Sequence, residues 1–439
     1  MNRQQVKDMV IKAIDDNREL ILNAGKAMYD NPEFGYKEFE GTKIVSNYFK
    51  NELGLQVEEG IAYTGCRARA NENATGPKVA ILGELDAISC NDHVDSNELG
   101  AVHACGHHIQ IAGMLGAATG LIKSGALEFL NGKVDFMATP AEEFVELDYR
   151  TKLRAEGKIK YFGGKQELIY KGAFDDVDMS MMFHALDLKD KKVLTGPVSN
   201  GFIGKTVKFI GKESHAGSAP HEGINALNAA MLGISNVHAQ RETFKDSDRV
   251  RFHPIITKGG DIVNSVPADV RMEAYVRART IEGMVDSNKK ANRGLIAGAY
   301  AVGAEIEITE IPGYLPILRH DSMEDILEGN LDLLGLKEDM IKGGDFTGSF
   351  DFGDVSHIMP TLHPMFGGIS GALHTREFNT VDEDLAILMP SKAMALTVVD
   401  LLFDNAEKAN EIISKFKPTM TKEEYLTFME SNDKVIKGI

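Results

Sequence analysis

The feature that most constrains the fold is an alternation of short apolar runs with amphipathic segments in the first third of the chain. Val79–Leu82 ends at Gly83, and Val134–Ala138 is stopped by Thr139-Pro140, so both have the length and composition of buried strands. Helical periodicity occurs over residues 4–29, 38–52 and 109–124. Strands that alternate with helices predict an α/β fold with a mainly parallel sheet covered by helices.

A different pattern begins near Gly204. Alternating strand-like runs and two helical segments follow one another in the order β-α-β-β-α-β, which is typical of a ferredoxin-like unit. The strand-like runs are Thr206–Ile210, Val250–Ile256, Asp269–Val276 and Ala304–Thr309, and the helical segments are Ala219–Ala239 and Ile281–Val302. After Gly313 the first pattern resumes. We therefore predict that residues 204–312 form a domain inserted into a domain made of residues 1–203 and 313–439.

Composition excludes several classes of partner. The chain has 48 Lys and Arg against 65 Asp and Glu, a net charge of −17, which disfavours binding to nucleic acid or to an anionic membrane. Cys66, Cys90 and Cys105 are too few and too uneven for a disulfide framework, so a reducing compartment is expected. Met1–Leu22 lacks the pattern of a signal peptide, and the apolar stretch Ile109–Ile122 is too short to span a membrane. We expect a cytoplasmic protein.

The first cluster of chemically active residues is His103-Ala-Cys-Gly-His-His108. Cys105 and His107 lie two residues apart around Gly106, which lets the backbone bend tightly enough for both side chains to face one cation. The alternative is a buried cysteine beside two surface histidines. Three imidazoles within six residues favour a metal site.

The second cluster is Thr139-Pro-Ala-Glu-Glu143, directly after a predicted strand. Adjacent carboxylates point in different directions, so one can ligate a metal while the other acts as a base on a bound water. The alternative is an acidic first turn that favours a helix dipole.

Two further histidines complete a set of donors. His184 follows the apolar run Met179–Met182, and His374 follows the glycine-rich segment Phe366–Gly371. Each is weak evidence alone. The combined set supplies one thiolate, three imidazoles and one carboxylate, which is too many for one tetrahedral ion and suits two ions that share a bridge. The donors are Cys105, His107, Glu143, His184 and His374.

Taken in order along the chain, these motifs resemble the aminoacylase/carboxypeptidase (M20) family of dinuclear metallopeptidases. The resemblance is strongest to the amidohydrolase branch that includes p-aminobenzoyl-glutamate hydrolase, auxin-conjugate amidohydrolases and a β-alanyl-lysine dipeptidase. The matching segments are Asn31–Tyr36, Gly83–Ala87, His103–His107, Thr139–Glu143, Met182–His184, Ser214–Ala216, Ala219–Leu227, Gly259–Asn264 and Gly348–Ser356. It implies a zinc-peptidase-like catalytic domain with an inserted lid and dimerisation domain.

The resemblance also implies a role for each metal ligand. Cys105 would bridge two divalent ions, zinc, manganese or cobalt, as a thiolate. His107 and His184 would complete one site, and Glu143 and His374 the other. His108 departs from the branch, which usually has Asp or Asn directly after the Cys-Gly-His motif. We expect this position to lie outside the metal ligands while affecting metal choice or the hydrogen bonds around them.

The remaining implied roles concern catalysis and substrate. Glu142 would be the general base, and Asp86 falls where the family has an acidic residue that supports the metal ligands. His215 would reach across a homodimer to the active site of the partner subunit and hold the substrate carbonyl or oxyanion. Asn264 and Arg277 would bind the carboxylate of the substrate, a task that suits the bidentate guanidinium of arginine.

The function that follows is hydrolysis of an amide bond by a metal-activated water. The substrate would be a small N-acyl or aminobenzoyl amino acid or a dipeptide. One alternative is a non-catalytic metal- or ligand-binding relative of the same fold. Another is a hydrolase with Cys105 as nucleophile and His107 as base, but two residues on one turn are poor geometry for such a pair, and Glu142 and Glu143 would have no role.

Overall fold

The computed structural model describes residues 1–438, which form two compact units. The first unit comprises residues 1–197, 318–345 and 355–419, and the second comprises residues 198–317, 346–354 and those from 420 onward. The prediction placed all of residues 313–439 with the first domain. The structure differs because two later segments of the chain belong to the second unit, one of them through strand pairing described below. The lid and dimerisation role of that unit stays a prediction.

The first unit is built on a six-stranded sheet with the order β1-β2-β6-β3-β7-β15. Neighbouring strands β6, β3, β7 and β15 are parallel, whereas β1 and β2 form an antiparallel edge. The expected mainly parallel sheet is therefore confirmed. The strands are β1 (Val57–Ile61), β2 (Gly65–Ala70), β3 (Lys78–Glu84), β6 (Lys133–Thr139), β7 (Met179–Met181) and β15 (Thr361–Leu362).

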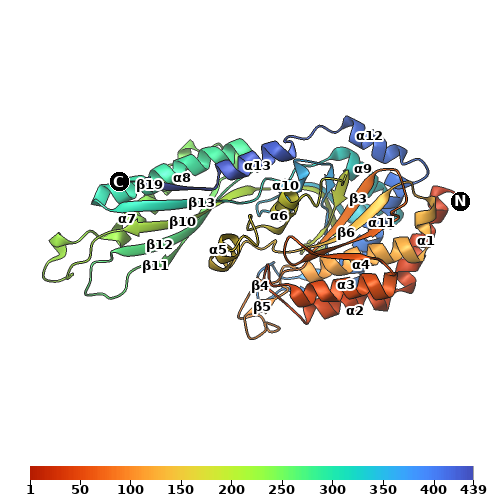
Figure 1. Cartoon of the computed structure of the whole chain (residues 1–439), viewed down its shortest axis with the longest axis horizontal. Helices are drawn as coiled ribbons and strands as arrows, with labels where there is room; N and C mark the ends of the chain where they lie inside the picture. The colour runs from red at the N-terminus through yellow and green to blue at the C-terminus, as the bar shows by residue number, and fades with distance from the viewer. Residues whose placement is uncertain (439) are drawn as a thin grey trace. The chain divides into compact units, whose positions relative to one another are not determined.

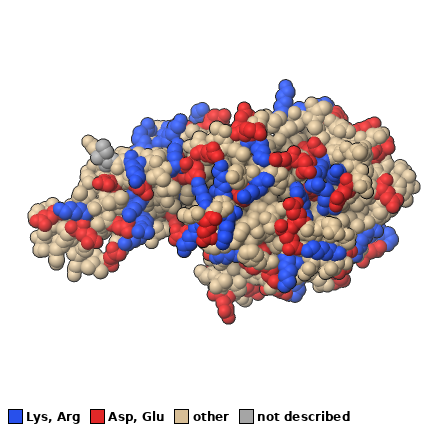
Figure 2. Space-filling model, in the orientation of Figure 1, with Lys and Arg blue, Asp and Glu red and all other residues tan. Residues whose placement is uncertain are grey.

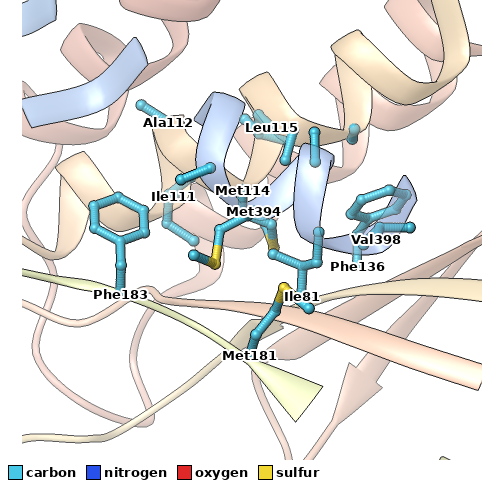
Figure 3. Close-up of a cluster of buried hydrophobic side chains, with 14 of the residues drawn as sticks. Ile81, Ile111, Ala112, Met114, Leu115, Phe136, Met181, Phe183, Met394 and Val398 are labelled. Atoms are coloured by element: carbon cyan, nitrogen blue, oxygen red, sulfur yellow. The ribbon is translucent and has the colours of Figure 1, made fainter. Parts of the chain in front are cut away.

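Helices cover this sheet, and one of the most buried is α4 (His107–Lys123), in which His107 through Leu121 are all buried. Figure 3 shows Met114 and Leu115 of α4 beside Met394 and Val398 of α11, above strand residues such as Met181. Glycines let α4 approach its neighbours closely: a Cβ added at Gly113 would overlap the ring of Phe183. The other helices of this unit are α1 (Arg3–Asp16), α2 (Arg18–Tyr29), α3 (Phe39–Leu53), α5 (Leu147–Ala155), α6 (Gly164–Lys171), α9 (Asp321–Leu333), α11 (Met389–Leu402) and α12 (Glu407–Lys415). The short helix α10 (Phe352–Ser356) has residues in both units.

The N-terminal segment corrects one expectation. Residues 4–29 were predicted as a single helix, but the structure has two, α1 and α2, which meet at Asn17. The Asn17 side chain donates a hydrogen bond from Nδ2 to the Ala13 carbonyl at 2.8 Å, and its backbone leaves the helical region at φ −108° and ψ 19°. A side chain that bonds to the backbone in this way competes with helix continuation.

Short strands shape the loops of the first unit. A four-stranded sheet has the order β14-β9-β16-β8, and two hairpin-like pairs join β4 to β5 and β17 to β18. These strands are β4 (Ile88–Ser89), β5 (Ala101–Val102), β8 (His184–Ala185), β9 (Val193–Ser199), β14 (Met340–Phe346), β16 (Met365–Phe366), β17 (Ile369–Ser370) and β18 (Asn379–Thr380).

The second unit is an antiparallel sheet with the order β11-β12-β10-β13-β19 and two helices packed on one of its faces (Figure 1). The β-α-β-β-α-β order is as predicted, and β19 extends the sheet by pairing with β13, which explains why the end of the chain belongs here. The predicted helix 219–239 is shorter, since Pro220–Glu222 form a separate 3₁₀ turn and Asn225 caps the helix proper. The elements are β10 (Gly201–Ile210), α7 (Ala226–Ala239), β11 (Arg251–Lys258), β12 (Asp269–Ala278), α8 (Ile281–Val302), β13 (Glu305–Pro312), α13 (Lys422–Ser431) and β19 (Lys434–Gly438).

Within the described residues, one helical stretch, Asp384–Leu402, is long and apolar enough to cross a membrane. It is 89% buried inside the structure, where α11 packs against α4, α1 and α9. Its apolar composition is therefore that of a core helix. On the face drawn in Figure 2, basic and acidic side chains are interspersed, so the excess negative charge is not gathered in one region of that face.

Candidate metal centre

The acidic motifs and histidines lie at the carboxyl edge of the parallel strands, where α/β proteins bind ligands. Glu84 is the last residue of β3, and Glu142 and Glu143 follow the end of β6, its parallel neighbour. His184 lies just beyond β7 on the other side of β3. Cys105 and His107 stand at the start of α4, and the loop between β17 and β18 supplies His374. Residues far apart in sequence thus meet at one edge.

Two groups of possible metal ligands form there, and Cys105 belongs to both. The first is Cys105, His107 and His184, and the second is Cys105, Glu143 and His374; within each group the ligand atoms lie within 4.8 Å of one another. Cys105 Sγ is 3.5 Å from His184 Nε2 and 3.2 Å from His374 Nε2, which is in turn 2.9 Å from Glu143 Oε1. The five residues predicted as ligands are thus brought together, with the thiol between the two groups.

Hydrogen bonds orient the two buried imidazoles. His107 donates from Nδ1 to the Asp86 carbonyl at 2.8 Å and approaches Asp86 Oδ1 at 3.2 Å. His184 donates from Nδ1 to the Ala185 carbonyl at 2.7 Å. In each ring the remaining nitrogen, Nε2, faces the group, which is how a metal-binding histidine is normally held.

The loop that carries Glu142 and Glu143 is fixed by other buried residues. The Glu143 backbone N–H donates to Asp86 Oδ2 at 2.8 Å, and the Ala141 N–H donates to Glu38 Oε1 at 2.7 Å. The buried guanidinium of Arg150 donates to the Glu143 carbonyl. Neither glutamate lies in a helix, because α5 begins only at Leu147, so the alternative of an acidic helical turn is wrong. Glu142 is buried, with Oε2 4.0 Å from His107 Nε2.

The electrostatics of this edge favour a cation. Burial, together with the carboxylates of Glu143, Glu142 and Glu84, raises the pKa of the Cys105 thiol well above its ordinary value. Burial lowers the pKa of His107, but the carboxylates of Glu84 and Asp86 outweigh it and raise that pKa to about 9. A divalent ion among these groups would reverse the balance for the thiol, since a coordinating thiol is deprotonated.

Two buried atoms in the groups test whether a metal fits. His107 Nε2 and Glu143 Oε1 are shielded from solvent, and each lies close to another potential ligand atom, Glu84 Oε2 at 3.0 Å and His374 Nε2 at 2.9 Å respectively. Buried nitrogen and oxygen atoms of the types that zinc prefers thus face one another at this edge. The residues present therefore fit divalent ions, and Cys105 is the residue that the two groups share.

Two residues near the centre were not assigned roles from the sequence. Glu84 forms a third group with His107 and Glu142, and Lys165 of α6 forms an ion pair with Glu84. Glu84 lies within the segment Gly83–Ala87 that matches the family, two residues before Asp86. His108 belongs to none of the three groups, and its ring packs against those of Tyr29 at 4.8 Å and His103 at 5.6 Å.

The predicted substrate-binding residues belong to the second unit. His215 is exposed, and its Nδ1 accepts hydrogen bonds from the backbone of Gly217 and Ser218 at 3.1 and 3.0 Å. Asn264 lies on the adjoining loop, where its carbonyl accepts from the Ala216 N–H. Arg277 of β12 donates to Ser349 Oγ at 2.7 Å, and its guanidinium lies 5.2 Å from the centre of the Phe202 ring. Their roles toward substrate stay predictions.

Comparisons with known proteins identify relatives along nearly the whole chain. Residues 199–293 match the family described as a peptidase dimerisation domain. The chain is 31% identical to the Xaa-Arg dipeptidase of Mus musculus over 91% of this chain and 90% of that protein. It is 30% identical to the Xaa-Arg dipeptidase of Homo sapiens, over 95% and 94%. Among solved structures, a dinuclear metal-binding peptidase of the M20 family from Bacillus subtilis aligns with a TM-score of 0.64 at 20% identity, over 88% and 99%.

The fold and the similarity along nearly the whole chain define the class of protein. The chain belongs to the M20 family of metallopeptidases. It is a metal-dependent amidohydrolase.

Proposed function

We propose that this protein is a dinuclear dipeptidase or N-acyl amino acid hydrolase in which Glu142 is the general base. The observation that supports it best is the pair of ligand groups that share Cys105, with the Glu142 carboxylate 4.0 Å from one of their members. When bound, the two ions would lower the pKa of a water and polarise the amide carbonyl, as in other metal-assisted hydrolases.

Glu142 would move the proton of that reaction. Its carboxylate would accept a proton from the attacking water and deliver it to the nitrogen of the departing amine as the amide C–N bond breaks. Glu143, its neighbour, points its Oε1 to His374 instead, so the two carboxylates divide the tasks of base and ligand. Asp86 would hold one ligand of each site, through His107 and through the backbone of Glu143.

The substrate proposal draws on the second unit. Arg277 is half-buried beside Phe202 and Ser349, a setting in which its guanidinium can bind a carboxylate through two parallel N–H···O hydrogen bonds. We propose that it binds the free carboxylate of the substrate together with Asn264, and that His215 supports the oxyanion. Because two relatives that are 30% and 31% identical to this chain are named for dipeptides that end in arginine, we propose dipeptides with a basic C-terminal residue as the first substrates to test.

We also propose a homodimer formed through the second unit. Strand β11 is the end strand of its sheet, and it exposes Ile255 and Ile256, while α7 exposes Met231 and Leu232. Exposed apolar side chains along an edge strand are typical of a surface that pairs with another chain. Dimers mixed from His215→Ala and Glu142→Gln subunits should regain activity if His215 serves the partner subunit. Verified heterodimers with no activity would contradict that arrangement.

The metal and the compartment are part of the same proposal. The thiolate and imidazole donors suit zinc, and manganese and cobalt also fit. All three cysteines are free, which supports a reducing compartment such as the cytoplasm.

The first test is turnover by metal-stripped protein to which zinc, manganese or cobalt is added back. The substrates are dipeptides ending in Arg or Lys, their neutral C-terminal counterparts, N-acetyl amino acids and p-aminobenzoyl-glutamate. Activity lost on chelation and restored by a metal supports the proposal, whereas activity that survives chelation would indicate the cysteine nucleophile instead. Two bound ions without turnover of any substrate would favour the non-catalytic alternative.

The second test isolates the base. Glu142→Gln should retain both ions and lower kcat by about a thousandfold, the range expected for removal of a general base. Glu146→Gln is the matched control, since Glu146 is four residues further along the same loop and pairs with Lys37 at the surface. A purified Glu142→Gln protein with an unchanged kcat would refute the role.

A further inference from the structure

A buried ion pair lies directly behind the first ligand group. Lys165 Nζ is 2.6 Å from Glu84 Oε1, and the side chains of both residues are shielded from solvent, at 0% and 1% exposure. Taking two charges out of water is costly, and an apolar pair of similar size would often stabilise the fold as well or better. Stability alone therefore does not explain the pair, and the orientation of the Glu84 carboxylate gives another reason for it.

The second oxygen of Glu84 faces the metal groups. Oε2 accepts a hydrogen bond from Gln110 Nε2 at 2.8 Å and lies 3.0 Å from His107 Nε2. That nitrogen is the donor atom of His107 assigned above to the metal, because Asp86 occupies the opposite side of the ring. Glu84, His107 and Glu142 each offer an atom within 4.8 Å of the others.

The distance of 3.0 Å between Glu84 Oε2 and His107 Nε2 is compatible with two ligands of one ion. Zinc binds nitrogen and oxygen donors at about 2.0–2.2 Å, so two such donors at angles between 90° and the tetrahedral value lie about 2.9–3.5 Å apart. Glu84 Oε2 and His107 Nε2 meet this condition without movement of either side chain. Lys165 and Gln110 hold the carboxylate at both oxygens, so its orientation is fixed.

We propose that Glu84 is an additional protein ligand of the ion held by Cys105, His107 and His184. Lys165 is its positioning residue: it binds Oε1, offsets the charge of the carboxylate and leaves Oε2 aimed at the ion. The inference rests on the dinuclear centre proposed above and adds a sixth protein donor to it. The ion on this side of Cys105 then has an all-protein set of four donors, whereas the ion on the other side has three.

The test uses Co²⁺ alone, titrated into the metal-stripped full-length protein and followed by visible absorption. The variant is the double substitution Glu84→Gln/Lys165→Met, which removes both charges and leaves no buried charge unpaired. The wild type should bind two ions. The double variant should bind one with unchanged affinity and the other about 100-fold or more weakly, with a changed visible spectrum as that ion loses an oxygen donor.

A matched control separates this result from a general effect of removing a buried pair. Lys205 and Glu310 form a similar pair in the second unit, 2.9 Å apart with both side chains at 0% exposure. Lys205→Met/Glu310→Gln should leave both Co²⁺ affinities and the spectrum unchanged. If the first double variant fails to fold, Glu84→Asp keeps the charge beside Lys165 but withdraws the oxygen from the ion, and it should weaken the same site.

Several outcomes would overturn the inference. Two ions bound by the double variant with wild-type affinities and spectrum would show that Glu84 is not a ligand. A loss of tens-fold or less without a spectral change would do the same, because that is the effect of residues that only support a ligand. If the wild type binds two ions and hydrolyses its substrate while the double variant also keeps both ions, only the role of Glu84 as a ligand is refuted. Wild-type protein that binds no pair of ions refutes the proposed centre itself.

Discussion

Asp86→Asn is the substitution that tests the geometry of the metal centre most directly. One oxygen of Asp86 accepts the Glu143 N–H at 2.8 Å, and the other lies 3.2 Å from His107 Nδ1. Asparagine has the same shape but only one acceptor oxygen. Whichever way the amide is turned, its NH₂ group meets either the Glu143 N–H or the His107 Nδ1–H, so a donor faces a donor.

The magnitude follows from which contact survives. The His107 ring keeps its stronger bond to the Asp86 carbonyl at 2.8 Å, so the amide should turn its oxygen toward the Glu143 N–H and place its NH₂ beside His107. Loss of an outer contact to a metal ligand typically costs 10–100-fold in affinity, which is about 1.4–2.7 kcal/mol. We expect a loss of that size for one of the two ions, and a smaller loss for the other.

The assay is calorimetric titration of zinc into stripped protein, combined with metal analysis after dialysis. Asp16→Asn is the control, because Asp16 is an exposed carboxylate that pairs with Lys12 at the surface, and its loss changes net charge equally. Asp86→Asn protein that binds two ions with wild-type affinities would refute the reasoning, since it would mean that neither ligand depends on the hydrogen bonds of Asp86.

Three further predictions concern stability and the bridging ligand. Lys205→Met should lower the free energy of unfolding by about 3–5 kcal/mol in urea titrations, because it leaves the buried Glu310 carboxylate without its nearest cation. Adding Glu310→Gln should recover much of this loss. A Lys205→Met protein as stable as the wild type would contradict the prediction. Burial raises the pKa of Glu324 to about 7, so its stabilising effect is complete below its unfolded pKa and is lost as the pH rises through 7. Glu324→Gln should therefore be more stable than the wild type at pH 8 and gain little at pH 4, and a gain that does not grow with pH would exclude burial of this carboxyl as the cause. Cys105→Ala should reduce the content of both ions, measured by metal analysis, whereas loss of only one would show that the thiolate does not bridge.

Apolar periodicity predicted most of the fold, because the burial of one face of a strand or helix is recorded in the spacing of its own residues. The strand Val79–Leu82 and the helix Ile281–Val302 were identified from apolar periodicity, and the structure has them as β3, extended at both ends, and as α8 with the same bounds. The break at Asn17 was missed because the apolar spacing continues on both sides of it. Strand β19 was missed because its place is set by pairing with β13, more than a hundred residues earlier in the chain.

The site was predictable where the chemistry of a residue type is specific. The donor atoms of one cysteine, three histidines and one glutamate indicate a metal site, and the structure brings these five residues together. The pair of Glu84 and Lys165 was not predictable in the same way. The two residues are 81 positions apart, and neither a lone lysine on a helix nor a glutamate after a strand indicates its partner.

The close contact between Gly113 and Phe183 links positions that are not otherwise connected. Gly113 lies on α4, six residues after His107, and Phe183 immediately precedes His184. A methyl group at Gly113 has no room beside the aromatic ring, so it would displace the helix that begins with one metal ligand or the backbone that carries another. A substitution at Gly113, in the apolar core, would thus change the affinity for metal without contacting the ion. A screen for inactive variants would therefore find substitutions at Gly113. From the sequence alone their effect would be attributed to loss of folding, although the direct cause would be weaker metal binding.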